Sequence, residues 1–367
     1  MSTTSQAAVL CAYNAPLEIR TYPVAANAGP GEAIIRVEMA GICGTDVHLW
    51  KGELSIPIPV ILGHETVGRI EQLGAGLERD WRGAALAVGD RVTWASSIVC
   101  GECYYCRQKR QPTRCVARKA YGISYNVDET PHLRGGYAQY IHLRAGSALF
   151  RLPDSLPTEA VIGAGCALTT ALHGLERCTV TPGDTVVVQG TGPVGMAALA
   201  VALQAGAEKV IVTGGPAHRL KAALEFGAHA AISIEEHTTP EARRAAVLAV
   251  AGPYGADVVV ECVGHPAAVP EGIELCRDGG KFAVLGQYAD SGAIMLNPHI
   301  ITRKQLEVRG SWGFEPRHTD IALRLLNSTH WKDKFAAQIT HRFPLADVNE
   351  ALETVKQWRS GKAVIIP

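Results

Sequence analysis

The feature that most constrains the fold is a glycine-rich turn between an apolar strand and an apolar helix. The β-branched run Thr185–Gln189 leads directly into a G-x-G-x-x-G turn, and an Ala/Leu-rich helical pattern follows. The first glycine permits a tight turn, the second lets a pyrophosphate approach the backbone, and the third allows close helix packing. Free N–H groups at the start of the helix would bind the phosphate. An ordinary strand–helix turn is the alternative. The pattern favours a dinucleotide site formed by Gly190, Gly192, Pro193, Val194 and Gly195.

The turn belongs to a longer alternation of strands and helices that begins at about Thr158. Helical patterns are notable at Val194–Ala205 and His218–Phe226. Alternating units with apolar strands imply a parallel sheet with helices on both faces. The predicted strands are Thr185–Gln189, Lys209–Thr213, Ala230–Ser233, Asp257–Cys262, Lys281–Gly286 and Leu306–Gly310.

The remainder of the chain has a different character. Residues up to about Pro157 are rich in Gly, Pro and short β-branched runs, which favours a mostly β module. In the tail, the pattern predicts a helix over Ala346–Arg359 and a last strand over Ala363–Ile366. At 367 residues, two domains are expected.

The end of the second parallel strand bears on the choice of dinucleotide. NAD-binding units usually place an acid there to hold the ribose hydroxyls. Here the strand ends in Gly214-Gly215-Pro216, and the nearest bases are His218 and Arg219. Arg219 is the favoured candidate to contact the ribose or a 2′-phosphate, and a solvated helix residue is the alternative. The sequence therefore leaves both NAD and NADP open.

Charge and composition exclude several classes of protein. Lys+Arg and Asp+Glu are each 35, so the balanced charge gives no attraction to nucleic acid or an anionic membrane. No apolar run reaches transmembrane length, and Met1–Leu10 lacks the pattern of a signal peptide. We therefore expect a cytoplasmic protein with a small-molecule partner and neither nucleic-acid nor membrane partners.

Four closely spaced cysteines indicate a metal site. A C-x2-C-x2-C-x8-C run on a short segment supplies four thiolates, which suits a closed tetrahedral zinc site of the structural kind. In a reducing compartment such clustering argues for metal rather than disulfides. Unrelated buried thiols and a nucleic-acid-binding zinc ribbon are the alternatives, and the neutral charge disfavours the ribbon. The predicted ligands are Cys100, Cys103, Cys106 and Cys115.

A second constellation is scattered along the chain. Cys43, His64 and Cys166 form a Cys2His set, which is known for catalytic zinc with an open fourth position. Asp46 is a candidate to orient His64, as ligating histidines normally require. Glu65 is either a neighbour of the metal or an occasional fourth ligand. Taken alone, each residue also has a structural explanation, such as a small buried thiol for Cys166.

These motifs, in this order, resemble the zinc-dependent medium-chain dehydrogenase/reductase family of the alcohol dehydrogenase type. The resemblance extends over almost the whole chain. It rests on Cys43–His48, Ile56–Glu65, the four-cysteine segment, Gly165-Cys166, the glycine turn, Gly135–Tyr140, Val260–Gly264 and His341–Leu345.

The resemblance implies an α/β protein with two domains. Residues 1–167 and 312–367 would form a GroES-like β-barrel catalytic domain, and residues 168–311 a Rossmann domain with a doubly wound parallel sheet. It further implies two zinc ions per chain, one catalytic and one structural, and a homodimer or homotetramer. The implied activity is hydride transfer between a secondary or cyclic alcohol and NAD(P)+, giving the ketone or aldehyde.

The resemblance also implies roles for individual side chains. The alcohol proton would leave through Thr45, the nicotinamide ribose and His48, while Thr170 and Val194 would flank the nicotinamide. Ordinary core packing is the alternative for the last two. By the same resemblance, the substrate pocket would include Trp50, Leu54, Ser96 and Ser97.

Two departures from the family pattern stand out. Eight residues separate the last two cysteines where seven are commonest, and Ile365 occupies a position where some members carry a pyrophosphate-binding Arg. Two rival functions stay open: a reductase of C=C or quinone substrates, and a non-catalytic zinc-binding scaffold of the same fold. The intact ligand set argues against the first, and the glycine turn with the relay candidates against the second.

Overall fold

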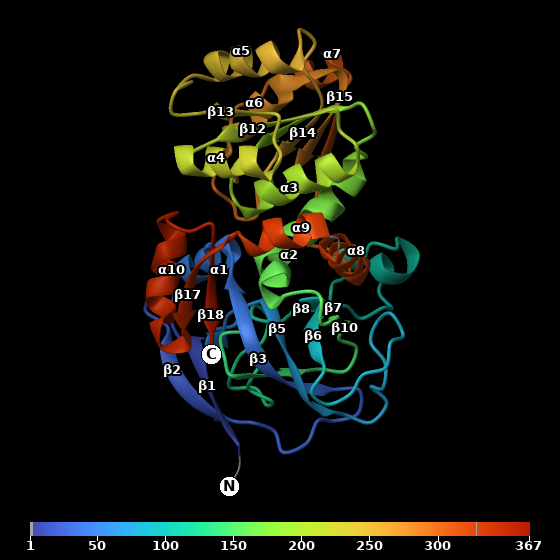
Figure 1. Cartoon of the computed structure of the whole chain (residues 1–367), viewed down its shortest axis with the longest axis vertical. Helices are drawn as coiled ribbons and strands as arrows, with labels where there is room; N and C mark the ends of the chain where they lie inside the picture. Colours follow the sequence, from blue (N-terminus) through green and yellow to red (C-terminus); the bar gives the residue numbers. More distant parts are fainter. Residues whose placement is uncertain (1–2, 328) are drawn as a thin grey trace. The chain divides into compact units, whose positions relative to one another are not determined.

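The computed structural model describes residues 3–327 and 329–367, and the chain divides into two compact units (Figure 1). One unit comprises Met1–Cys166 together with Glu315–Pro367, and the other comprises Ala167–Phe314. In the part of the chain that the structure describes, no helix is both long and apolar enough to span a bilayer.

The second unit is built on a six-stranded parallel sheet. Val186–Val188 and Val258–Val260 are fully buried, as expected for strands that helices cover on both faces. The strand order is typical of a doubly wound dinucleotide-binding sheet, so the predicted fold of this region is confirmed. The order is β13 (Ala230–Ser233), β12 (Lys209–Gly214), β11 (Thr185–Gln189), β14 (Ala256–Glu261), β15 (Cys276–Val284) and β16 (Glu307–Gly310).

Helices cover both faces of this sheet. Figure 1 shows α3 (Pro193–Gln204) and α4 (Ala217–Phe226) on one side, with α5 (Pro240–Ala251) and α6 (Ala268–Leu275) on the other. A short α7 (His299–Arg303) precedes β16. Helix α3 is apolar around most of its circumference, so it lies deepest and directly follows the glycine turn.

The first unit is mostly β-structure. A three-stranded sheet has the order β2 (Glu18–Pro23), β1 (Thr4–Leu10) and β4 (Val60–Ile61), and a two-stranded sheet joins β7 (Ser97–Ile98) to β8 (Lys119–Ala120). The largest sheet has the order β10 (Leu149–Arg151), β6 (Arg91–Trp94), β5 (Glu65–Leu73), β3 (Ala33–Ile42), β18 (Lys362–Ile366) and β17 (Ile339–Pro344), with β9 (Tyr140–Leu143) also on β3.

Strand β3 organises this sheet. Along one edge it pairs with β5, and along the other edge its first half pairs with β9 and its last residues with β18. The tail of the chain therefore returns to the sheet of the first unit. The apolar strand predicted there is confirmed, with Lys362 as its first residue.

The helices of the first unit were only partly predicted. Helix α10 (Val348–Lys356) lies inside the predicted range, and the short turn η3 (Leu345–Asp347) precedes it. The structure adds α1 (Gly44–Lys51), α8 (Pro316–Leu326), α9 (Thr329–Ala336), η1 (Tyr104–Gln108) and η2 (Pro112–Arg114). Helix α2 (Thr158–Cys178) begins in the first unit, ends in the second and is broken at Gly165.

Helix α1 was not predicted, because the capping interactions at its two ends stabilise it rather than its composition. Asp46 accepts a hydrogen bond from the backbone N–H of Cys43 and closes a capping box. Gly52 then ends the helix in the left-handed conformation at φ 77°. The interior sequence Thr-Asp-Val-His has no clear apolar period.

Candidate metal centres and dinucleotide site

The scattered constellation is brought together in the first unit. One donor atom from each of Cys43, His64, Glu65 and Cys166 lies within 4.8 Å of the others. Cys43 is the N-cap of α1, His64 and Glu65 stand at the start of β5, and Cys166 follows the break in α2. Three separate segments of the chain thus converge on one point.

Two glycines shape the backbone at this point. Gly63 has φ 93°, and a Cβ there would lie 2.6 Å from the Tyr137 ring. Gly165 has φ 48° and ψ −150°, which breaks α2 immediately before Cys166. Side chains other than glycine rarely adopt these positive φ angles. The backbone therefore turns His64 and Cys166 toward the cluster at sites where glycine is required.

Asp46 orients the histidine. It is fully buried and accepts hydrogen bonds from the Cys43 backbone N–H at 2.8 Å and the Tyr137 hydroxyl at 3.0 Å. Its other oxygen, Oδ1, faces Nδ1 of His64 at 3.3 Å. Burial disfavours the charged imidazole, but Asp46 and the Cys43 sulfur raise the pKa of His64 well above its ordinary value. With Nδ1 turned to Asp46, Nε2 is left for a metal.

The donor geometry fits zinc. The sulfurs of Cys43 and Cys166 are 3.5 Å apart, close to the about 3.8 Å separation that two thiolates take on tetrahedral zinc. A hydrogen bond from Cys166 lowers the pKa of the Cys43 thiol well below its ordinary value. Nδ1 of His64 and Oδ1 of Asp46 are both buried and face each other at 3.3 Å, so this contact with Asp46 holds the imidazole with Nε2 toward the sulfurs' side of the cluster.

A buried lysine was not anticipated from sequence. Lys362 is 2% exposed and forms an ion pair with Oε2 of Glu65, while the Cys166 backbone N–H donates to Oε1 at 2.8 Å. Burial alone raises the pKa of Glu65, but Lys362 and His64 hold it below its ordinary value. The sequence signal for this lysine is its position as a single cation directly before the apolar run Ala363–Ile366.

The two relay candidates lie on helix α1. Thr45 and His48 are three residues apart, so their side chains share one face of the helix. Both are half-buried. Nδ1 of His48 contacts the Glu53 carboxylate, which lies just beyond the helix and was not identified from sequence. His48 thus stands between the buried part of α1 and an exposed acid.

The proposed pocket residues have defined contacts in the first unit. The indole N–H of Trp50 donates to the Ala15 carbonyl at 2.7 Å, and Arg118 donates two hydrogen bonds to the Ser97 hydroxyl. Ser96 is buried and Leu54 half-buried. The hydroxyl of Ser97 is therefore engaged by the protein itself.

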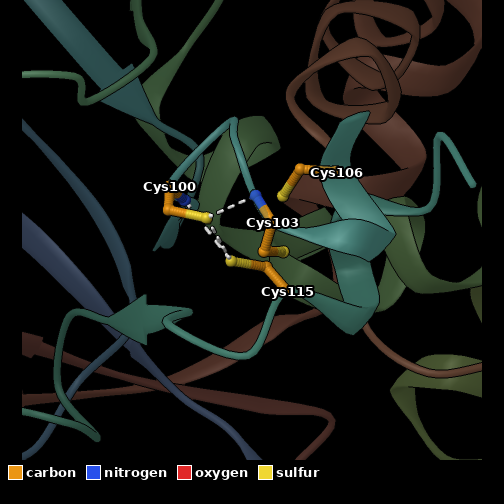
Figure 2. Close-up of side chains that lie close together, drawn as sticks. All are labelled: Cys100, Cys103, Cys106 and Cys115. Atoms are coloured by element: carbon orange, nitrogen blue, oxygen red, sulfur yellow. Dashed lines mark hydrogen bonds between the residues drawn. The ribbon is translucent and has the colours of Figure 1, made fainter. Parts of the chain in front are cut away.

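The four-cysteine segment forms the second candidate metal centre. Figure 2 shows the side chains of Cys100, Cys103, Cys106 and Cys115 pointing toward one another. The sulfurs of Cys100 and Cys115 are 3.5 Å apart, and the backbone N–H of Cys103 donates to the Cys100 sulfur at 3.4 Å. Backbone N–H groups of Cys106 and Val116 lower the pKa of Cys103 to about 6. Four converging sulfurs fit a closed structural zinc.

The glycine turn has the space that a pyrophosphate requires. A Cβ on Gly192 would meet no atom within 4 Å, whereas a Cβ on Gly195 would lie 2.0 Å from the Gly190 carbonyl oxygen. Gly190 itself has φ 106°. Gly192 is the N-cap of α3 and Pro193 is its first residue, so the free backbone N–H groups of the helix begin here. Gly190 is therefore suited to the tight turn, Gly192 to the open face and Gly195 to close helix packing.

A buried carboxylate joins the neighbouring loops. Glu261 ends β14, is fully buried, and accepts hydrogen bonds from the backbone N–H groups of Val263 and Gly264, both at 2.7 Å, and of Gly286 at 3.1 Å. It thereby fastens the loop after β14 to the loop after β15. In open α/β sheets ligands bind at this carboxyl edge. Glu261 was not identified as a site residue from sequence, although a lone acid ends its apolar strand.

The other predicted cofactor residues lie in the same unit. The Thr191 hydroxyl donates to the Gly215 carbonyl at 2.8 Å, so the glycine turn touches the end of β12 beside Gly214. Thr170, Val194 and Arg219 are each half-buried. Burial lowers the pKa of Arg219.

Family models match both parts of the chain. Residues 29–154 match the alcohol dehydrogenase GroES-like domain, and residues 193–328 match the zinc-binding dehydrogenase domain. Together the two matches span most of the chain. They confirm the predicted fold class.

Named relatives are dehydrogenases of alcohols. The chain is 38% identical over 350 residues to 5-exo-hydroxycamphor dehydrogenase of Pseudomonas putida, with 92% of each chain covered. It is 33% identical to sorbitol dehydrogenase of Halalkalibacterium halodurans and 32% identical to L-threonine 3-dehydrogenase of Idiomarina loihiensis, again with 92% of each chain covered.

Solved structures agree with these relatives. An alcohol dehydrogenase of Thermotoga maritima superposes with a TM-score of 0.94 at 33% identity, and 100% of both chains is covered. A zinc-binding dehydrogenase of Sinorhizobium meliloti bound to NADP gives a TM-score of 0.84 at 28% identity, also with 100% of both chains covered.

Proposed function

The chain belongs to the zinc-dependent medium-chain dehydrogenase family of the alcohol dehydrogenase type, and on this basis we propose that its substrate is a secondary alcohol, with cyclic alcohols as the first candidates. The enzyme class itself, a zinc-dependent NAD(P)-dependent alcohol dehydrogenase acting on small molecules, follows from the family. Its catalytic unit would be the first compact unit and its dinucleotide-binding unit the second. The observation that carries the proposal is the convergence of Cys43, His64 and Cys166 in the first unit of a chain whose second unit has a complete glycine turn.

In the proposed mechanism, Cys43, His64 and Cys166 hold the catalytic zinc and the glycine turn holds the dinucleotide. When bound, zinc supplies Lewis acidity that eases deprotonation of the alcohol, and the nicotinamide accepts the hydride. Asp46 keeps His64 in the orientation and tautomer that leave Nε2 for the metal. Cys100, Cys103, Cys106 and Cys115 hold a second zinc that stabilises their segment.

The proton is proposed to leave along helix α1. The Thr45 hydroxyl would accept it from the substrate while giving up its own proton to the relay, and His48 would release a proton to solvent. The Glu53 carboxylate at Nδ1 of His48 stabilises the imidazolium that forms, because an opposite charge favours the charged ring. His48 also has the partial exposure that this role requires.

The second unit is proposed to supply the main contacts to the cofactor. Gly192 leaves open space for the pyrophosphate, while Gly190, Pro193 and Gly195 shape the turn. We propose that Gly214 and Arg219 border the adenosine ribose, and that Val194 and Thr170 flank the nicotinamide. An arginine here, with no acid at the end of β12, is compatible with a 2′-phosphate, so NADP and NAD are tested side by side.

The name of one relative supports the substrate class. 5-exo-Hydroxycamphor carries its hydroxyl on a ring carbon, and this relative is 38% identical to the chain. The test is reduction of NAD+ and NADP+ with a panel of linear and cyclic secondary alcohols, alongside the zinc content per chain. Two zinc ions and chelator-sensitive turnover that favours cyclic alcohols would support the proposal. One zinc ion and no turnover would instead favour a zinc-binding scaffold.

We propose that the enzyme is a homodimer or homotetramer in the cytoplasm. Strand β16 lies at the edge of its sheet, and all four of its residues are exposed. An exposed edge offers unpaired backbone groups to a second copy of the chain. Val308 on this strand is 43% exposed and Met295 nearby in sequence is 97% exposed. A reducing compartment would keep the four clustered thiols available for metal.

A further inference from the structure

The carboxylate of Glu65 lies in the catalytic cluster, yet both of its oxygens already have partners. Oε1 accepts a hydrogen bond from the Cys166 backbone N–H at 2.8 Å, and Oε2 is paired with Nζ of Lys362. The side chains of Lys362 and Glu65 are 2% and 1% exposed, so water does not replace either contact. Binding a metal through Oε2 would require Glu65 to give up its lysine.

Backbone closes around the same carboxylate. A Cβ on Gly41 would lie 2.5 Å from Oε2 of Glu65 and 3.0 Å from Cε of Lys362. A Cβ on Gly165 would lie 2.3 Å from Oε1. The carboxylate therefore occupies a slot that only glycine at these two positions leaves free, which confines it to its present contacts.

The sheet register places the lysine there. In β3, Gly41 pairs with Glu65 of β5 on one side and with Val364 of β18 on the other. Lys362, the first residue of β18, reaches past this glycine to the carboxylate. The pair thus comes from two strands that are almost 300 residues apart in sequence, and β3 fixes their spacing.

The negative charges around the cluster explain why a lysine lies beside Glu65. Two thiolates already balance a divalent cation, and Asp46 adds a further buried negative charge beside His64. The Glu65 carboxylate is one more buried negative charge beside them, which is costly unless a cation compensates it. Lys362 supplies that cation directly, so the carboxylate does not depend on the charge of a metal.

We propose that Lys362 is a positioning residue that keeps Glu65 out of the metal's coordination, so that a zinc held by Cys43, His64 and Cys166 retains an open position. This inference rests on the proposed function, because it concerns the same metal site. In the absence of the lysine, Glu65 would become the fourth ligand and close the site to exogenous molecules.

The test uses the full-length enzyme with Co2+ in place of the catalytic zinc, and imidazole as a probe of the open position. Lys362→Met is expected to weaken imidazole binding by about tenfold or more, because an attached ligand competes at a high effective concentration. Its cobalt absorption spectrum should change without imidazole. The double variant Lys362→Met/Glu65→Gln should recover both the wild-type affinity and spectrum. Unchanged imidazole binding in Lys362→Met, or no recovery in the double variant, would overturn the proposal.

Lys362→Met removes one partner of a buried ion pair and therefore destabilises the fold, so a second variant keeps the shape of the site: in Glu65→Gln the amide oxygen can still accept a hydrogen bond from Lys362. Glu65→Gln alone should leave the cobalt spectrum and imidazole affinity close to wild type. Tighter imidazole binding with a changed spectrum would identify Glu65 as a ligand in the wild-type protein and overturn the proposal. If wild-type protein took up no cobalt at the Cys43 site, the proposed function would fail instead, so the two failures are distinguishable.

Discussion

At the scale of single residues, the catalytic cluster contains two kinds of residue, the proposed metal ligands and the residues that position them. Cys43, His64 and Cys166 present donor atoms, while Asp46 and Lys362 fix the histidine and the carboxylate beside them. The positioning residues are more deeply buried than the sulfur ligands, with exposed fractions of 0% for Asp46 and 2% for Lys362. Their roles are therefore visible only once the surrounding strands are in place.

Replacing Cys43 by Ala tests the assignment of the catalytic centre. We expect zinc content to fall from two ions per chain to one, and turnover to fall by about 1,000-fold or more, because Lewis-acid stabilisation contributes several kcal/mol. Cofactor binding, measured by fluorescence titration with NAD(P)H, should remain. Cys11→Ala is the matched control, because Cys11 belongs to neither metal cluster. Loss of cofactor binding with both zinc ions retained would contradict the assignment.

At the scale of elements, Gly192 and Gly195 have different roles in the turn between β11 and α3. Gly192→Ala adds a Cβ into open space, so we expect the free energy of unfolding to fall by at most about 1 kcal/mol, as for a poorer N-cap. Cofactor affinity, however, should fall by about tenfold or more, because the Cβ occupies the path of the phosphate.

Gly195→Ala is the matched comparison within the same turn. Its Cβ would collide with the Gly190 carbonyl oxygen, so we expect a loss of about 1–3 kcal/mol in stability even without cofactor. Thermal unfolding with and without NAD(P)H distinguishes the two variants. Equal loss of stability in both would show that Gly192 does not face open space.

The loops after β14 and β15 depend on one carboxylate. Glu261→Gln replaces a carboxylate, which only accepts hydrogen bonds, by an amide whose NH2 group would face backbone N–H donors. Hydrogen bonds to charged groups contribute about 1.5–3 kcal/mol each. We expect faster amide hydrogen exchange at Val263, Gly264 and Gly286, together with weaker cofactor binding. Glu307→Gln, on an exposed edge strand, is the control and should change neither. Faster exchange confined to other segments would contradict this role of Glu261.

At the scale of the whole molecule, the exposed edge of the parallel sheet is the proposed site of association. Val308→Lys places a charge on β16, and charged side chains on an edge strand oppose pairing with another chain. We expect light scattering to give a lower mass for this variant than for wild type. Val88→Lys, at a 66% exposed position in the other unit, is the control. A wild-type protein that is already a monomer would exclude the proposal.

The parts of this protein that were predictable from sequence are those encoded by local patterns. The glycine turn and the four cysteines each lie within a short segment, so spacing alone predicts a strand–turn–helix and a closed metal site. The apolar strands of the second unit were located almost to the residue, because strands buried on both faces appear as continuous apolar runs. Strand β15 begins five residues earlier than predicted, at Cys276 rather than Lys281, because its first part is not apolar.

Other features were decided only by tertiary structure. Helix α1 depends on its caps, and Glu261 gains its meaning from loops that follow two different strands. The pairing of Glu65 with Lys362 required β3 to bring β5 and β18 into one sheet. The sequence does not show which residue a charged side chain will pair with. The energy of an ion pair depends on its burial and on neighbours that only the folded chain brings together. Sequence alone thus determined which ligands this protein offers, and the fold decided how their surroundings hold them.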